Sequence, residues 1–362
     1  MRIARAILTL VLVPVVLSGA VAGQARSTAP KAGTDRIVFL SMFESASDVE
    51  DSRTPCQRVR DYFDRSPKTK DLPGEKPAFC DKVVDVIAGK AGPSEDAPNS
   101  RLRAAKIVTD SRRRIVLTEP GTRSVHILDF ASRKYTRIDG RGNDRMHFPY
   151  GVAVDADDNV YVTDQRRGTI AVFNAEGKFK RFIGDFDGEH AFEQPNCVAI
   201  DRATGRLYLT DTSRQFLLIY DRKGKKIASV GKRGGGTGPA EFRLPTELAL
   251  HGQEVFVLDK RNRRIQVLDL EGRYKREIRT DALGSEAPKG MAIDTQGRIY
   301  ILLDVGLIEV FSSTGERLFR FGHYGAGAGE FRESSGIYID SADRLYVSDT
   351  GNRRVQIFQI KR

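Results

Sequence analysis

The chain has 362 residues, of which 40% are apolar and 30% charged, and its formal net charge is +11. This balance excludes a disordered chain, and three cysteines are too few for a disulfide-rich mini-fold. The chain contains 34 Gly, 19 Phe and 11 Tyr but no Trp, which favours short strands joined by tight turns and predicts an all-β protein.

Residues 1–22 have the pattern of an export signal. Arg2 and Arg5 precede an apolar run that extends from Ala6 to Leu17, and small residues follow at Ala20 and Ala22. The run is short, so it fits a cleaved signal peptide better than a membrane span. We therefore expect an exported protein, periplasmic or secreted, with no stable membrane span after cleavage. The alternative is a segment that is retained as an N-terminal anchor.

Residues 23–80 are predicted to form an N-terminal extension, in which Arg36–Phe43 has the composition of a strand. Cys56 and Cys80 lie in this stretch, and an oxidising compartment would allow them to pair. A loop of about 25 residues closed in this way contributes roughly 3 kcal/mol. The alternative is three unpaired cysteines, with Cys197 a buried thiol in an apolar run.

A repeat of about 45 residues organises positions 81–362. Each repeat has a first strand such as Gly151–Asp155 and a second such as Val160–Asp164. The acid that ends the second strand recurs at spacings of 45, 47, 48, 45 and 45 residues. The recurring acids are Glu119, Asp164, Asp211, Asp259, Asp304 and Asp349.

Four short strands per repeat, repeated six times, predict a six-bladed β-propeller with four-stranded antiparallel blades. The last repeat ends after its third strand. Lys82–Gly89 matches the pattern of a fourth strand and precedes the first repeat. We expect this N-terminal strand to complete the last blade and protect its edge.

The wording of the repeats resembles that of NHL repeats. The resemblance rests on Phe148–Asp155, Val160–Asp164 and Asp349–Phe358, and it covers about three quarters of the chain. The first repeat lacks the Pro-x-Gly entry, and the fifth is shortened after Asp304. The family implies a six-bladed propeller. Its members include scaffolds, RNA binders and a few enzymes, so the fold does not choose a function.

Two repeated features are interpreted as structural. The glycine-rich segments 231–238 and 322–331 lie between two strands, whereas a phosphate-binding loop leads into a helix. The recurring acids stand at strand ends, where a carboxylate accepts hydrogen bonds from backbone N–H groups of a turn.

Function is expected where the repeats differ, at one mouth of the central channel. The residues at the repeat position that follows a proline in four of the six repeats are predicted to project there and to contact a ligand. In blade order they are Ala105, Tyr150, Asn196, Thr246, Lys289 and Ser335.

No catalytic or metal-binding set is predicted, and no cofactor. In the NHL-like amidating lyases some equivalent positions resemble Pro-His-Gly and supply zinc ligands, but none of the six residues here is His. The five histidines lack metal-ligand spacing. The alternative is that His147, His190 and His323 converge from inter-blade loops.

Short basic clusters occur at Arg112–Arg114, Arg166–Arg167, Lys225–Lys226, Lys260–Arg264 and Arg353–Arg354, and several of them occupy the turn between the second and third strands. They favour an anionic envelope polymer, polysaccharide or acidic protein as the partner of a monomer, and an exported protein would rarely meet nucleic acid. The alternative is a merely solvated basic surface.

Two functions follow from these features. The favoured one is a non-enzymatic binding or scaffold module for a protein, polysaccharide or small ligand. The alternative is a metal-dependent hydrolase or lyase at the channel mouth, similar to propeller lactonases or amidating lyases. In that case Asn196 and Glu247 are the candidate ligands, and Tyr150 or Lys289 handles protons.

Overall fold

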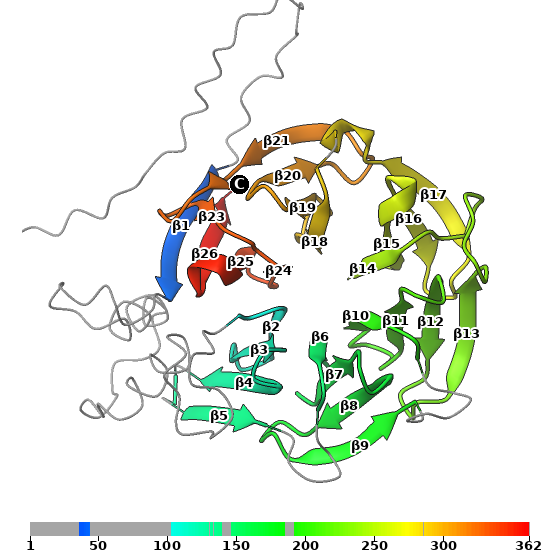
Figure 1. The fold of residues 1–362 in the computed structure, drawn as a ribbon, viewed down its shortest axis with the longest axis horizontal. Coiled ribbons are helices and arrows are strands. Elements are labelled where there is room, and N and C mark those ends of the chain that lie inside the picture. Colours follow the sequence, from blue (N-terminus) through cyan, green and yellow to red (C-terminus); the bar gives the residue numbers. More distant parts are fainter. Residues whose placement is uncertain are drawn as a thin grey trace, which may run out of the picture.

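The fold was analysed in a computed structural model, which describes residues 36–43, 103–129, 131–132, 134–139, 146–184, 192–284 and 286–361. Six four-stranded antiparallel sheets are arranged around a central axis (Figure 1). The prediction of a six-bladed β-propeller is confirmed. Among the helices of these ranges, none has the length and apolar composition needed to cross a membrane.

The strands of each sheet follow one another from the axis outward (Figure 1). The first sheet contains β2 (Ile107–Thr109), β3 (Ile115–Glu119), β4 (Ser124–Asp129) and β5 (Lys134–Ile138). The second contains β6 (Pro149–Val154), β7 (Val160–Asp164), β8 (Thr169–Phe173) and β9 (Phe179–Ile183). The third contains β10 (Pro195–Ile200), β11 (Leu207–Asp211), β12 (Phe216–Tyr220) and β13 (Lys226–Gly231).

The second half of the ring repeats this order. The fourth sheet contains β14 (Pro245–His251), β15 (Glu254–Asp259), β16 (Arg264–Asp269) and β17 (Tyr274–Arg279). The fifth contains β18 (Pro288–Ile293), β19 (Ile299–Leu303), β20 (Ile308–Phe311) and β21 (Arg317–Phe321). The sixth contains β24 (Gly336–Ile339), β25 (Arg344–Asp349), β26 (Arg354–Lys361) and β1 (Arg36–Phe43).

Short elements lie between the sheets. The glycine-rich segment before β24 contains the parallel pair β22 (His323–Tyr324) and β23 (Glu330–Phe331). Single turns of 3-10 helix occur at η3 (Lys260–Asn262), η4 (Asp281–Leu283) and η5 (Thr350–Asn352). As expected, both glycine-rich segments lead from an outer strand to an inner strand and not into a helix.

The outermost strand of the sixth sheet is β1, which pairs antiparallel with β26 from Arg36–Lys361 to Phe43–Val355. The prediction that Arg36–Phe43 forms a strand is therefore confirmed. The sequence had pointed to Lys82–Gly89 for this position, and that segment lies outside the described residues. Two stretches of this chain carry a β-rich pattern, and pattern alone does not decide which one pairs with β26.

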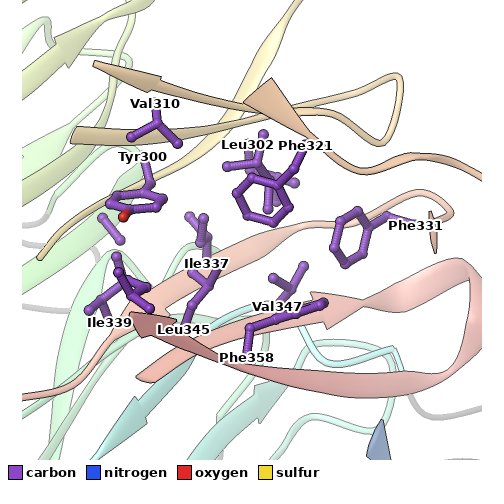
Figure 2. Packing of buried hydrophobic residues seen from close by; sticks show 13 residues of the cluster. Tyr300, Leu302, Val310, Phe321, Phe331, Ile337, Ile339, Leu345, Val347 and Phe358 are labelled. Atoms are coloured by element: carbon purple, nitrogen blue, oxygen red, sulfur yellow. The ribbon is translucent and has the colours of Figure 1, made fainter. Parts of the chain in front are cut away.

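The hydrophobic core lies between neighbouring blades. Figure 2 shows the contact between the fifth and sixth sheets, where Tyr300 and Phe321 face Leu345 and Phe358. Nearly all side chains of the second and third strands are buried, because neighbouring sheets pack against both faces of each sheet. In β19 and β25, for example, every residue is buried. Among the described residues, five such apolar clusters stabilise the ring.

The recurring acids tie each blade to the loop that precedes it. Asp349 is fully buried and accepts hydrogen bonds from the Arg332 backbone N–H (2.7 Å), Asn352 Nδ2 (2.9 Å), Arg354 Nε (2.7 Å) and Gln356 Nε2 (3.0 Å). Asp164, Asp211 and Asp259 likewise accept backbone N–H groups from the loop before the inner strand. The structural interpretation of these carboxylates is confirmed.

Candidate functional site

The six inner strands surround a cavity of about 240 Å³ on the propeller axis. Its wall is mostly aliphatic, from side chains such as Val152, Leu248 and Ile337. We call the end at which the inner strands begin the entry mouth. Two charged side chains, Lys106 and Glu247, lie at this end of the cavity.

Lys106 and Glu247 occupy equivalent positions in their repeats, which we call the channel ring. The six members of the channel ring are Lys106, Gly151, Cys197, Glu247, Gly290 and Gly336. Glycine is required where the next blade comes close. A Cβ at position 151 would lie 2.2 Å from the backbone oxygen of Asn196, and one at position 336 would lie 2.4 Å from that of Ala105. Side chains on the ring are therefore exceptions to the repeat.

The Lys106 ammonium group forms an ion pair with Glu247 from the other side of the channel. Lys106 Nζ lies 2.7 Å from both Glu247 Oε1 and Oε2, and it also donates to the Lys289 carbonyl at 3.4 Å. Burial raises the pKa of the Glu247 carboxyl, although the lysine opposes this shift. For Lys106, burial alone lowers the pKa, but Glu247 together with Tyr150 and Cys197 outweighs burial and raises the pKa overall, so the lysine stays cationic.

Two further side chains, those of Tyr150 and Cys197, lie near this ion pair. The Tyr150 ring lies 5.5 Å from Lys106 Nζ, within the range of a cation–π contact. Cys197 donates weakly to the Leu248 carbonyl at 3.6 Å, and burial raises the pKa of its thiol to about 12. The thiol is therefore neutral at physiological pH, and Cys197 is a structural residue rather than a nucleophile.

The predicted mouth residues stand one position before the channel ring, and several use their polar groups within the protein. Asn196 Oδ1 accepts from Gln165 Nε2 at 3.2 Å. The Ser335 hydroxyl donates to the Ala104 carbonyl at 2.8 Å, in the neighbouring blade. Thr246 Oγ1 is buried without a hydrogen-bond partner.

Lys289 differs from these residues because its side chain is exposed. Lys260 is half-buried beside it and follows Asp259, the register partner of Pro245 at the start of β14. Burial and the charge of Lys289 both lower the pKa of Lys260. Among the described residues, neither lysine forms an ion pair. The positive charges of these two lysines therefore repel each other at the entry mouth.

Further cations surround the mouth in the turns between second and third strands. They include Arg166, Arg167, Arg261, Arg263 and Arg353. These turns lie at the same end of the blades as the beginnings of the inner strands, because adjacent strands are antiparallel. The basic clusters that occupy these turns therefore lie on the face of the entry mouth, whereas Arg112–Arg114 and Lys225–Lys226 lie in turns at the other end of the blades.

The histidines that are described do not converge there. His126 is buried and contacts Glu119 Oε2 at 3.2 Å, and His323 is exposed and contacts Glu330 at 2.9 Å. His190, Cys56 and Cys80 lie outside the described residues, so the disulfide stays a prediction. Within the described ranges, no three His, Cys, Asp or Glu side chains are grouped in a way that could hold a metal ion.

The sequence did not lead us to Lys106, and it suggested Glu247 only as a candidate ligand in the alternative function. A signal for both was present, because Lys106 and Glu247 replace the glycine of the repeat three blades apart and carry opposite charges. In a ring of six, positions three blades apart face each other. A pair of opposite charges at two such exceptions predicts a contact across the channel.

Two family models match parts of the chain. A model described as a 6-bladed beta-propeller matches residues 189–305, and an NHL repeat model matches residues 331–358.

Curated relatives match over less than half of the chain. Peptidyl-glycine alpha-amidating monooxygenase of Mus musculus is 27% identical over 172 residues, which is 44% of this chain and 17% of that protein. Peptidyl-glycine alpha-amidating monooxygenase A of Xenopus laevis is 27% identical over 198 residues, or 49% of this chain and 20% of that protein. The chain thus spans a fifth or less of the length of these relatives.

Solved structures match over most of the propeller. A streptogramin B lyase superposes with a TM-score of 0.56 at 11% identity, covering 73% of this chain and 96% of the lyase. A gluconolactonase from Xanthomonas campestris superposes with a TM-score of 0.55 at 17% identity, covering 72% and 87% of the two chains. At these identities the likeness shows the fold alone.

Proposed function

We propose that this six-bladed β-propeller, in which an NHL repeat model matches residues 331–358, is a non-enzymatic binding module whose partner contacts the entry mouth. The observation that carries this proposal is the pair Lys260 and Lys289. Beneath them Lys106 and Glu247 neutralise each other, so the two lysines and the surrounding arginines leave the mouth positively charged.

The partner that fits this face is anionic. Carboxylate groups of an acidic polysaccharide or protein satisfy the ammonium groups of Lys260 and Lys289 and relieve their mutual repulsion. We further propose that the protein is exported and meets such a polymer outside the cytoplasm. This part rests on the signal-like segment 1–22 of the sequence.

Titration calorimetry with polygalacturonate, a carboxylated polysaccharide, tests the proposal, and uncharged dextran serves as the ligand control. We expect saturable binding that weakens with salt, and the double variant Lys260→Glu/Lys289→Glu should bind at least about tenfold more weakly. The matched control is Lys178→Glu/Lys223→Glu, which reverses two lysines at the other end of the blades. Equal losses in both double variants, or equal binding of dextran, would contradict a binding site at the mouth.

One observation favours a second candidate, a hydrolase or lyase at the same mouth. Glu247 is a buried carboxyl with a raised pKa in a cavity, which is a common setting for a general acid or base. The structures named as a lyase and a gluconolactonase share this fold. No step is routed through a metal, because the described residues offer no group of ligands for one.

Assays on a panel of lactones and esters separate the two candidates. The second predicts turnover by the wild type and at least about a hundredfold loss in Glu247→Gln at unchanged thermal stability. Elemental analysis of protein purified without chelators adds a metal readout. Turnover that is absent in the wild type, or equal in the variant, eliminates this candidate.

A further inference from the structure

A second and larger cavity lies away from the channel, at the outer side of the third blade. Its volume is about 650 Å³, within the usual range of roughly 300–1,000 Å³ for small-molecule pockets. Strands β12 and β13 form one side, and Gly184 and Phe192 border it from the neighbouring loop ends. We call it the outer pocket. Residues 185–191, which join Gly184 to Phe192 in the sequence, lie outside the described residues.

The outer pocket exists because the third blade departs from the repeat. In the fourth blade, Arg264 and Gln266 extend from β16 and donate to the carbonyls of Gly238 and Glu241, so they fill this face. Phe216 and Leu218 take these two positions in β12 and have no such groups.

The outer strand adds to the space. Ser229 of β13 stands opposite Leu218, whereas the second blade places Phe182 at the same position, opposite Ala171. A small residue thus replaces a ring that covers the equivalent surface of the second blade. Phe182 there packs under the guanidinium group of Arg167, at 4.0 Å.

The floor of the outer pocket is apolar and aromatic. Leu218 and Tyr220 are buried, Phe216 is partly exposed, and Phe192 meets the Tyr220 ring edge to face at 5.9 Å. Burial raises the pKa of the Tyr220 phenol to about 12, so its hydroxyl stays a neutral hydrogen-bonding group. Such a floor suits a planar aromatic body.

The rim of the outer pocket is cationic at both ends. Arg214 and Arg233 lie toward the entry mouth, and Lys225 and Lys226 lie at the opposite end. Arg214 forms an ion pair with Glu193, with 3.2 Å between Arg214 Nε and Glu193 Oε1. The other three are exposed and form no ion pair within the described part of the chain. An anionic group on the ligand can therefore contact these exposed cations next to the aromatic floor.

We propose that the outer pocket binds an aromatic organic anion, with its ring on Phe216 and Leu218 and its charged group at Lys225 and Lys226. The apolar floor supplies affinity through burial, and the rim selects the charge. This site is separate from the entry mouth. The test of this proposal is therefore independent of the test of the function proposed above.

The probe for this site is 8-anilino-1-naphthalenesulfonate, an aromatic anion whose fluorescence rises in apolar surroundings. Its uncharged counterpart, N-phenyl-1-naphthylamine, has the same ring system without the sulfonate. Fluorescence titration of the full chain should give one saturable site for the anion, and at least about tenfold weaker binding of the neutral compound. Added salt should weaken binding of the anion only.

Two variants localise the binding. Ser229→Phe introduces the side chain that the second blade carries at this position, and it should abolish the saturable site. Lys225→Glu should weaken binding of the anion about tenfold and leave the neutral compound unchanged. The matched control is Lys178→Glu, because Lys178 and Lys225 occupy the same turn position, each donating its backbone N–H to the residue four before it.

Thermal unfolding of each variant shows whether the ring is intact. The proposal is overturned by an absence of saturable binding in the wild type, by equal binding of the two compounds, or by Ser229→Phe binding as the wild type does. Loss of binding in Lys178→Glu as strong as in Lys225→Glu also overturns it, because the charge effect would then not be local.

Discussion

The blades and the channel ring both bury charged side chains, and they do so in different ways. In the fourth and sixth blades, Asp259 pairs with Arg264 and Asp349 with Arg354, five residues apart within one strand–turn–strand unit. In the channel ring, Lys106 pairs with Glu247, 141 residues away in another blade.

The two arrangements have different roles. The pairs in the blades repeat, and each also holds the backbone of a preceding loop, so they belong to the construction of the fold. Among the described residues the pair across the channel occurs once, at a position where the repeat has glycine. Charges that repeat support the scaffold, and charges that break the repeat mark the surface where this propeller differs from others.

The largest expected effect comes from breaking a repeated pair. Asp349→Ala removes the carboxylate that the buried Arg354 guanidinium and three further donors share as an acceptor. Loss of one partner of a buried pair costs about 3–5 kcal/mol, so the free energy of unfolding should fall by about that amount in chemical denaturation.

The fifth blade offers the control for this variant. Asp304 stands at the same repeat position but is exposed, and it accepts the Ala287 backbone N–H at 3.2 Å. Asp304→Ala should cost about 1 kcal/mol or less. Equal losses in the two variants would show that the buried pair adds nothing beyond the backbone bond.

The next effect depends on pH. Lys106→Met removes the cation that opposes the burial of Glu247, so the folded-state pKa of this carboxyl rises further. An acid whose folded pKa is raised stabilises the protein below its unfolded pKa and loses that contribution as pH rises through the folded pKa. The variant should therefore lie near the wild type at about pH 4 and lose roughly 1.4 kcal/mol per pH unit above that, up to the folded pKa.

The double variant Lys106→Met/Glu247→Leu is the control for this titration. With both charges absent, the additional loss of stability that Lys106→Met shows as pH rises should disappear, and stability at pH 7 should be within about 1 kcal/mol of the wild type or above it. Denaturation measured between pH 4 and pH 8 checks both variants. A pH dependence that persists in the double variant would assign it to another group.

A smaller effect is expected at the glycines of the channel ring. In Gly151→Ala the new Cβ meets the Asn196 carbonyl oxygen, so neighbouring blades must move apart, at a loss of about 1–3 kcal/mol. Gly121→Ala is the control, because no atom lies within 4 Å of its Cβ position and its φ is not positive. Thermal unfolding should show a change within about 0.5 kcal/mol for this control, and a loss equal to that of Gly151→Ala would contradict the packing argument.

The fold was predictable because the regular spacing of similar segments in the sequence gives the length and the number of the repeats. The acids at Asp164, Asp211 and Asp259 mark the ends of second strands in both sequence and structure. Their hydrogen-bonding role was also predictable, since it depends on local chain geometry. The partner of β26 was not, because Arg36–Phe43 and Lys82–Gly89 both fit an outer strand and the pairing is long-range.

The candidate site was predictable in position but not in composition. The predicted mouth residues stand at or next to the beginnings of the inner strands, but which side chains meet there depends on reach across the ring. Lys106 reaches Glu247 because its four-carbon stem spans the channel. A local sequence pattern does not show which residues come within such reach. The outer pocket was missed because it arises from residues that are absent from one blade, Arg and Gln in particular.

The pairing of β1 with β26 has a consequence for biosynthesis. Phe43 and Val355 are separated by roughly 300 residues, so β1 leaves the ribosome long before its partner exists. Contacts this distant form late, and a nascent chain with five finished sheets still has two strand edges that invite pairing with other molecules. The time between synthesis of these two strands is when this protein most needs a chaperone.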